Sequence, residues 1–152
     1  MAYENAKATL KEVQRQWTAY NVLYLRAERL EAEIGASGLN YDGMPHSGTP
    51  SSPTEAIAIM LADTKAELNK TWAAYMEARN KAVGIINRID DYKQSAVLKY
   101  RYIDGLKWED IAMLLTPEEK AAQYEYMTVR HVHRIHAAAL CEVQMILGGF
   151  EK

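Results

Sequence analysis

The chain has 152 residues, a length that suits one domain, or a small domain with a helical extension. With 49% hydrophobic residues and a formal net charge of −2, it is neither a disordered chain nor a protein that binds nucleic acid through overall charge. Its one cysteine, Cys141, excludes an intramolecular disulfide, and no apolar run approaches the roughly 20 residues that span a bilayer. Helix-forming residues dominate, so we expect an all-α protein of the cytoplasm without membrane contact.

Apolar residues at alternating spacings of three and four predict a first helix over residues 3–34. They are Tyr3, Ala6, Leu10, Val13, Trp17, Tyr20, Tyr24, Ala27 and Ile34. Gly35 and Gly38 should end this helix, because glycine tolerates the left-handed conformation that follows many helices. This stripe is typical of a helix that packs lengthwise on another helix.

Residues 35–53 are rich in glycine and proline and are expected to form a loop. Ser52 or Thr54 should cap a second helix over residues 54–90, with Pro53 in its first turn. The positions expected to form its packing seam recur in heptads: Ile57, Leu61, Thr64, Leu68, Trp72, Tyr75, Ala78, Ala82, Ile85 and Ile89. Residues 1–90 are thus predicted to be a long antiparallel helical hairpin that serves as a dimerisation or partner-binding arm.

Residues 91–152 are predicted to form a second, helix-turn-helix domain. Asp90 or Asp91 should cap a helix over residues 92–103, which the pair Asp104-Gly105 ends, and a short helix follows at 107–115. The positions expected to be buried are Val97, Leu98, Arg101 (through its stem), Tyr102, Trp108, Ile111, Ala112 and Leu115.

Thr128 is expected to cap the last helix. Its apolar stripe consists of Val132, Ile135, Ala139, Val143 and Ile146. With that stripe toward the core, the first two turns should present Val129, Arg130, His131, His133 and Arg134 outward. A recognition helix touches base edges and phosphates from such positions, since arginine pairs with guanine and histidine can donate a hydrogen bond.

The stretch from Tyr92 to Leu147 resembles region four of sigma-70-type transcription factors. More closely, the chain resembles phage-encoded sigma-like late-gene regulators of the ArpU and RinA types. The residues that carry the resemblance are Leu98, Arg101-Tyr102-Ile103, Gly105, Trp108-Glu109, Ile111-Ala112, Thr128, Val132, Arg134-Ile135-His136 and Ala139-Leu140.

This resemblance implies binding of double-stranded DNA at a promoter or operator in a bacterial host, and contact with RNA polymerase. Carried over by position, the DNA-facing residues are Arg130, His131, His133 and Arg134, while Thr128 and Val129 lie near the DNA backbone. The chain departs from the family pattern at residues 116–127, where a short turn is usual. Thr116-Pro117-Glu118-Glu119 is a helix start in which Thr116 should be the cap, so this segment is either an inserted short helix or the beginning of one helix to Leu147. The fresh cap at Thr128 favours the insertion.

Other functions have weaker support in the sequence. One alternative is a helical adaptor that keeps a sigma-like fold and binds RNA polymerase or another phage protein without reading DNA. Another is a small terminase-like packaging component. His133, His136 and Cys141 lack the carboxylate or cysteine pair that would complete a zinc site, and no catalytic motif occurs. We therefore expect no enzyme, no metal and no cofactor.

Overall fold

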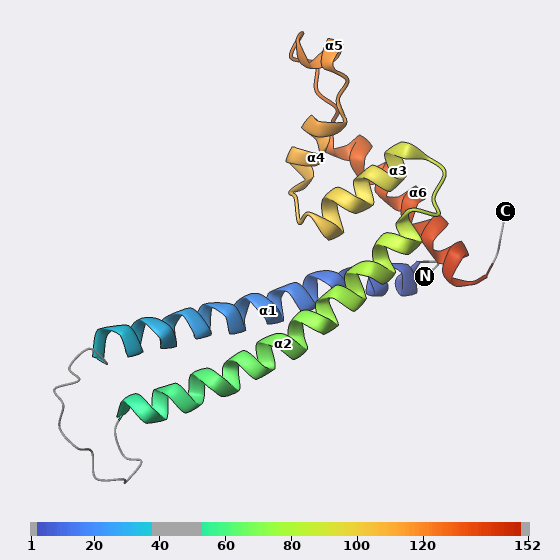
Figure 1. Cartoon of the computed structure of the whole chain (residues 1–152). Helices are drawn as coiled ribbons and strands as arrows, with labels where there is room; N and C mark the ends of the chain where they lie inside the picture. The colour runs from blue at the N-terminus through green and yellow to red at the C-terminus, as the bar shows by residue number, and fades with distance from the viewer. Residues whose placement is uncertain (1–2, 38–52, 150–152) are drawn as a thin grey trace, which may run out of the picture. The chain divides into compact units, whose positions relative to one another are not determined.

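A computed structural model describes residues 3–37 and 53–149, and within these ranges every element is helical. In chain order the elements are α1 (Glu4–Ser37), α2 (Pro53–Ile86), α3 (Tyr92–Leu98), the π-helix η1 (Lys99–Ile103), α4 (Trp108–Leu115), α5 (Glu118–Ala121) and α6 (Val129–Leu147) (Figure 1). The all-α prediction is confirmed for the described residues. None of their helices combines the length and the apolar character needed to cross a membrane.

The chain divides into two compact units. The central unit comprises residues 16–75, and the terminal unit comprises residues 1–15 together with residues 76–152. Both α1 and α2 contribute to each unit, because the division falls within these two helices.

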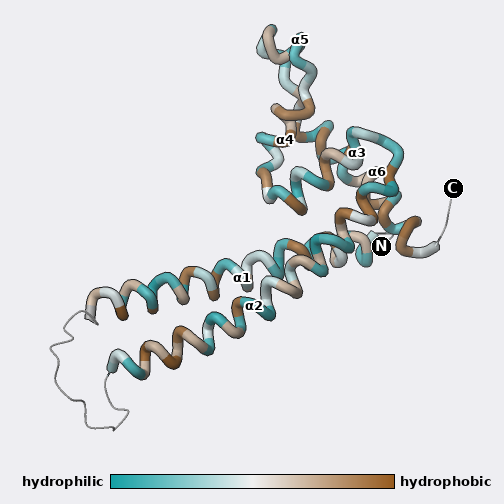
Figure 2. Tube along the Cα trace, in the orientation of Figure 1, coloured by the Kyte–Doolittle hydropathy of each residue, from teal (hydrophilic) through white to brown (hydrophobic). Residues whose placement is uncertain are grey.

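In the central unit, segments of α1 and α2 run antiparallel. Three side-chain pairs link them: Trp17 with Tyr75 (5.3 Å between ring centroids), Tyr20 with Trp72 (5.0 Å) and Glu31 with Lys65 (an ion pair of 2.9 Å). The residue number in α2 falls as the residue number of its pair in α1 rises, which is the order that antiparallel helices produce. Hydrophobic and polar residues are interleaved along both helices (Figure 2), as expected for helices with one buried stripe.

The ends of the two long helices differ from the sequence prediction. Helix α1 continues through Gly35 to Ser37, so the expectation that Gly35 ends it is wrong. A helix tolerates glycine at a cost of roughly 1 kcal/mol relative to alanine. Helix α2 ends at Ile86 rather than near residue 90, and tighter turn bonds follow it, such as the one from the Ile89 amide to the Ile86 carbonyl (3.1 Å). The predicted cap Ser52 and most of the predicted loop, residues 38–52, lie outside the described residues.

The core of the terminal unit is formed where α3, α4 and α6 pack together. Val97, Ile111 and Val132 are fully buried there, and Ala112 is 3% exposed. The small side chain of Ala112 suits a close approach of two helices. At the other end of α6, the amide of Ala6 donates a hydrogen bond to the side-chain carbonyl of Gln144 (3.0 Å), so the first turns of α1 lie against the last turns of α6.

The predicted helix over residues 92–103 is present, but its second half is π-helical. Asp91 caps its start, because its carboxylate accepts a hydrogen bond from the Gln94 amide (3.0 Å). In the π-helical part, the Asp104 amide donates to the Lys99 carbonyl (3.0 Å), and the Arg101 carbonyl accepts from the Gln14 side chain (2.8 Å). The wider π-helical turn changes which backbone groups pair with each other, and the Arg101 carbonyl hydrogen-bonds to α1. Gly105 follows with the positive φ of +68° that the predicted turn requires.

Candidate functional site

The first turn of α6 is fixed by its cap. Thr128 has an extended backbone (φ −75°, ψ 148°), and its hydroxyl accepts a hydrogen bond from the His131 amide (3.1 Å). This geometry confirms the predicted cap. The side chains of Arg130, His131 and Arg134 are all exposed near this end of the helix.

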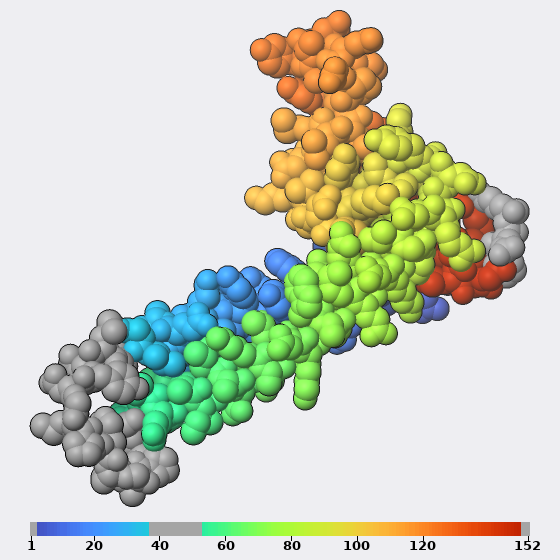
Figure 3. Space-filling model, viewed as in Figure 1, coloured from blue at the N-terminus to red at the C-terminus, as the bar shows by residue number. Residues whose placement is uncertain are grey.

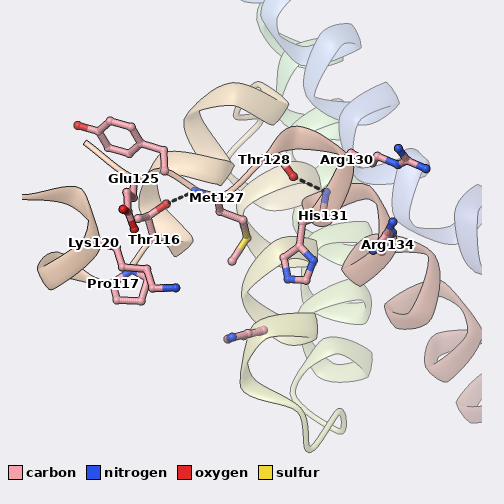
Figure 4. A pocket seen from close by; sticks show the side chains of 11 residues that line it. Thr116, Pro117, Lys120, Glu125, Met127, Thr128, Arg130, His131 and Arg134 are labelled. Carbon is pink, nitrogen blue, oxygen red and sulfur yellow. Dashed lines mark hydrogen bonds between the residues drawn. The ribbon is translucent and has the colours of Figure 1, made fainter. Parts of the chain in front are cut away.

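A groove of about 520 Å³ lies beside this end of α6 (Figure 4). Its walls come from the first turn of α3, from the segment between α4 and α6, and from α6 itself. The lining residues are Lys93, Thr116, Pro117, Lys120, Glu125, Tyr126, Met127, Thr128, Arg130, His131 and Arg134. All of them belong to the terminal unit.

The groove is basic although the chain as a whole is not. Its lining holds two lysines and two arginines against the single carboxylate of Glu125, hence a charge of +3 with His131 neutral. Within the described ranges none of the four lysine and arginine side chains is engaged in an ion pair or a hydrogen bond. The positive end of the α6 dipole lies at the same place, which further favours an anion there.

The structure separates the six predicted site residues into two groups. Thr128, Arg130, His131 and Arg134 line the groove, whereas Val129 and His133 do not. The expectation that Val129 faces outward is wrong, because this side chain is half-buried against the core of the terminal unit. His133 is exposed, but its ring lies against another aromatic side chain of the terminal unit.

Sequence reasoning missed two cations of the groove. Lys93 lies in α3, distant from α6 in the sequence, and Lys120 lies in α5, on the segment that directly precedes α6. No periodicity or spacing marks either lysine, since an isolated lysine in a polar stretch is ordinarily a solvated surface residue. Only the packing of the helices brings them beside Arg130 and Arg134.

Segment 116–127 forms a projection that is closed at its base by one hydroxyl group. Of the two predicted alternatives, the structure has the separate short helix α5 rather than one helix to Leu147. The Thr116 hydroxyl donates to the Ala112 carbonyl (2.7 Å) and accepts from the Met127 amide (2.8 Å). It therefore does not cap α5, and that expectation is wrong. The projection stands out in orange from the body of α3 and α4 (Figure 3).

Within the projection, α5 is followed by a turn that has strained backbone. Tyr124 has a φ of +60°, a region that costs a non-glycine residue roughly 1–2 kcal/mol. The Glu125 amide donates to the Lys120 carbonyl (2.9 Å), and the Tyr124 amide donates to the Ala121 carbonyl (3.0 Å). These bonds fold the chain back sharply after α5.

A second cluster surrounds Trp108, which contacts residues of α6 that do not line the groove. The Arg101 guanidinium lies 4.4 Å from the centroid of the Trp108 ring, and His133 and His136 lie 4.5 and 4.8 Å from it. The Tyr102 hydroxyl and His136 Nε2 are 2.8 Å apart in a buried hydrogen bond. This cluster joins η1, α4 and α6 through aromatic and cation–π contacts.

The buried position of His136 keeps its imidazole neutral. Burial, followed by the electrostatic influence of His133, Lys7 and Arg101, lowers the pKa of His136 to about 4. Burial raises the pKa of its partner Tyr102. The neutral imidazole is therefore part of the packed structure at physiological pH.

No residues suited to a metal are gathered in the described part of the chain. No group of three His, Cys, Asp or Glu side chains there is placed to hold an ion, and Cys141 is exposed. Comparison with known proteins found no matching family model, no matching curated protein and no matching solved structure.

Replacing Thr116 by valine should lower the free energy of unfolding by about 1–3 kcal/mol, because the Met127 amide and the Ala112 carbonyl both lose the partner that the buried Thr116 hydroxyl provides. Thermal or urea unfolding followed by circular dichroism measures this change. Thr71→Val is the matched control, since its hydroxyl makes only an exposed bond to the Glu67 carbonyl. Equal effects of the two substitutions would contradict the role assigned to Thr116.

Acidification should destabilise the terminal unit through His136. Because its native pKa is about 4 against an ordinary 6.5, the unfolded chain binds more protons between these values, so stability falls as the pH decreases through that interval. We expect a loss of roughly 1–2 kcal/mol, below full conversion of the shift because the ring edge retains some access to water.

The measurement is urea unfolding at several pH values between 7 and about 4. The variant His136→Gln keeps a hydrogen-bonding group for Tyr102 but cannot be protonated. Its stability should depend less on pH in this interval than that of the native protein. Identical pH profiles would show that His136 does not carry the effect.

Proposed function

We propose that this protein is a transcriptional regulator that binds double-stranded DNA through the first two turns of α6. The observation that carries the proposal is the groove at this end of the helix, where Arg130 and Arg134 are exposed and unpaired within the described ranges. The resemblance to phage sigma-like regulators supports it and suggests a phage or prophage origin.

The packing of the terminal unit suits a helix-turn-helix. Helix α4 precedes α6 in the chain and packs against it through Ile111 and Ala112. In such motifs the first helix crosses the DNA backbone, and the second enters the major groove with its N-terminal residues toward the bases. A buried stripe along α6 with an exposed, capped N-terminus meets this requirement.

The exposed residues of α6 divide between reading bases and positioning the helix. Arg130 and Arg134 lie four residues apart and thus on one face of the helix. Each guanidinium can form two parallel hydrogen bonds to a guanine edge, and each such pair discriminates against a wrong base by roughly 1–3 kcal/mol. Thr128 and His131 lie where contacts to the DNA backbone are expected.

The proposed function also includes a contact between α4 and another protein. Met113 and Leu114 are each 55% exposed on this short helix, a large apolar exposure for two adjacent residues. They support a contact with RNA polymerase, which a regulator of this kind needs at a promoter. They are also the observation that favours the alternative function, an adaptor that binds a protein and does not read DNA.

The test is a selection of genomic fragments by the purified full-length protein at low salt. The native protein should enrich one sequence, whereas the double variant Arg130→Ala/Arg134→Ala should lose at least about 100-fold in affinity for it, because two base contacts disappear. Binding of the selected fragment should also weaken steeply with salt.

The control is Arg79→Ala/Arg88→Ala, which removes two arginines of the terminal unit that do not line the groove. It should bind the selected sequence like the native protein. If the folded native protein enriches no sequence, the DNA-binding proposal fails, and the adaptor function becomes the better explanation.

We also propose that the protein is a homodimer formed through its central unit. Val22 and Leu25 are 61% and 56% exposed, and Ile59 is 60% exposed. Two antiparallel helices cannot cover their own outer faces, and a second copy is the partner that symmetric oligomers most often use. A dimer would also present two α6 helices to two half-sites of DNA.

Sedimentation should therefore find a dimer for the native protein at micromolar concentration. Val22→Lys/Leu25→Lys should shift it to a monomer, because these residues share one helix face and would place charges in the interface. Asn80→Lys/Asn87→Lys adds the same charge at exposed polar positions of the terminal unit and should leave the dimer intact. A native monomer at this concentration would refute the dimer.

A further inference from the structure

The basic groove includes residues outside α6, the helix that is proposed to contact base edges. Arg130 and Arg134 on α6 form one side of it, and Lys120 and Glu125 lie across from them (Figure 4). Lys93, from the first turn of α3, completes the positive lining. Three separate stretches of chain thus direct cations to one cavity.

Two of these cations cannot belong to a recognition helix. Lys93 precedes α6 by more than 30 residues, and Lys120 lies on the projection that the Thr116 hydroxyl closes. Within the described ranges neither side chain is engaged in an ion pair, so both are available for an external anion. Like charges brought together in this way repel one another, and a bound anion would relieve that repulsion.

The chemistry of the lining suits a phosphate group. A lysine ammonium is a flexible point charge that commonly binds phosphate, and arginine binds it through parallel hydrogen bonds. The groove volume of about 520 Å³ exceeds what one phosphate occupies, and the groove is open to solvent. A phosphodiester within a continuous strand could therefore pass along it.

We propose that the groove binds the phosphate backbone of one DNA strand, with Lys93 and Lys120 as its phosphate-contacting residues. This inference rests on the proposed function, since the strand is the one whose bases α6 reads. The projection of residues 116–127 then acts as a second DNA-contacting element beside α6. It supplies affinity without sequence preference, because phosphates are alike in every sequence.

This assignment explains how a terminal unit with little net charge could hold DNA. Binding that rests on a few placed phosphate contacts depends on where the cations lie rather than on their overall number. Each lysine that contacts a phosphate adds about 0.9 to the slope of log affinity against log salt concentration.

The experiment measures affinity for the selected DNA fragment at several salt concentrations by fluorescence anisotropy. Lys93→Gln/Lys120→Gln should weaken binding about 10-fold or more at low salt and reduce the slope by about 2, with about 0.9 for each lost contact. The preferred sequence should stay the same, because both lysines act on phosphates. Circular dichroism should report an unchanged fold, since both side chains are exposed.

Lys11→Gln/Lys81→Gln is the matched control. It removes two exposed lysines from the same unit, outside the groove, and should change the slope by less than 0.5, roughly half of one phosphate contact. If the native protein binds DNA and both double variants have the native slope, the phosphate assignment is overturned while the proposed function stands. If the native protein binds no DNA, the proposed function itself fails and the assignment fails with it.

Discussion

The close packing of α4 on α6 is the contact on which the rest of the terminal unit depends. Ile111 and Val132 are fully buried in it, and Ala112 is small enough to let the two helix backbones approach. This contact turns one face of α6 inward, and the opposite face of its first two turns is therefore exposed. A bulky side chain in place of Ala112 would separate the helices and change the direction in which Arg130 and Arg134 point.

Thr116 and Trp108 extend this contact in two directions. The Thr116 hydroxyl joins the end of α4 to the chain just before α6, so the projection that carries Lys120 leaves and returns at one point. Trp108 lies at the start of α4 and packs against Arg101, His133 and His136. The two ends of α4 thus contact two different sides of α6, the groove on one and the aromatic and cation–π cluster around Trp108 on the other.

Charge distribution matters more here than net charge. The chain carries a formal charge of −2, yet the groove lining has two lysines and two arginines against one glutamate. Composition therefore argued against nucleic-acid binding, whereas the local arrangement favours an anionic ligand. The difference arises because folding brings Lys93 and Lys120 to the N-terminal end of α6, and screening limits the influence of more distant carboxylates to about 10 Å.

Local signals in the sequence were sufficient for the helical class, for the cap at Thr128 and for a cap at Asp90 or Asp91, because capping and the positive φ of Gly105 involve only neighbouring residues. The structure has this second cap at Asp91. Helical periodicity likewise identified most of the buried positions. The tertiary structure alone decided that Val129 packs inward, that His133 lies on Trp108, and that Thr116 closes the projection. Each of these depends on a partner distant in the sequence or on the width of a helix–helix contact, and the spacing of residues along one helix carries no information about either.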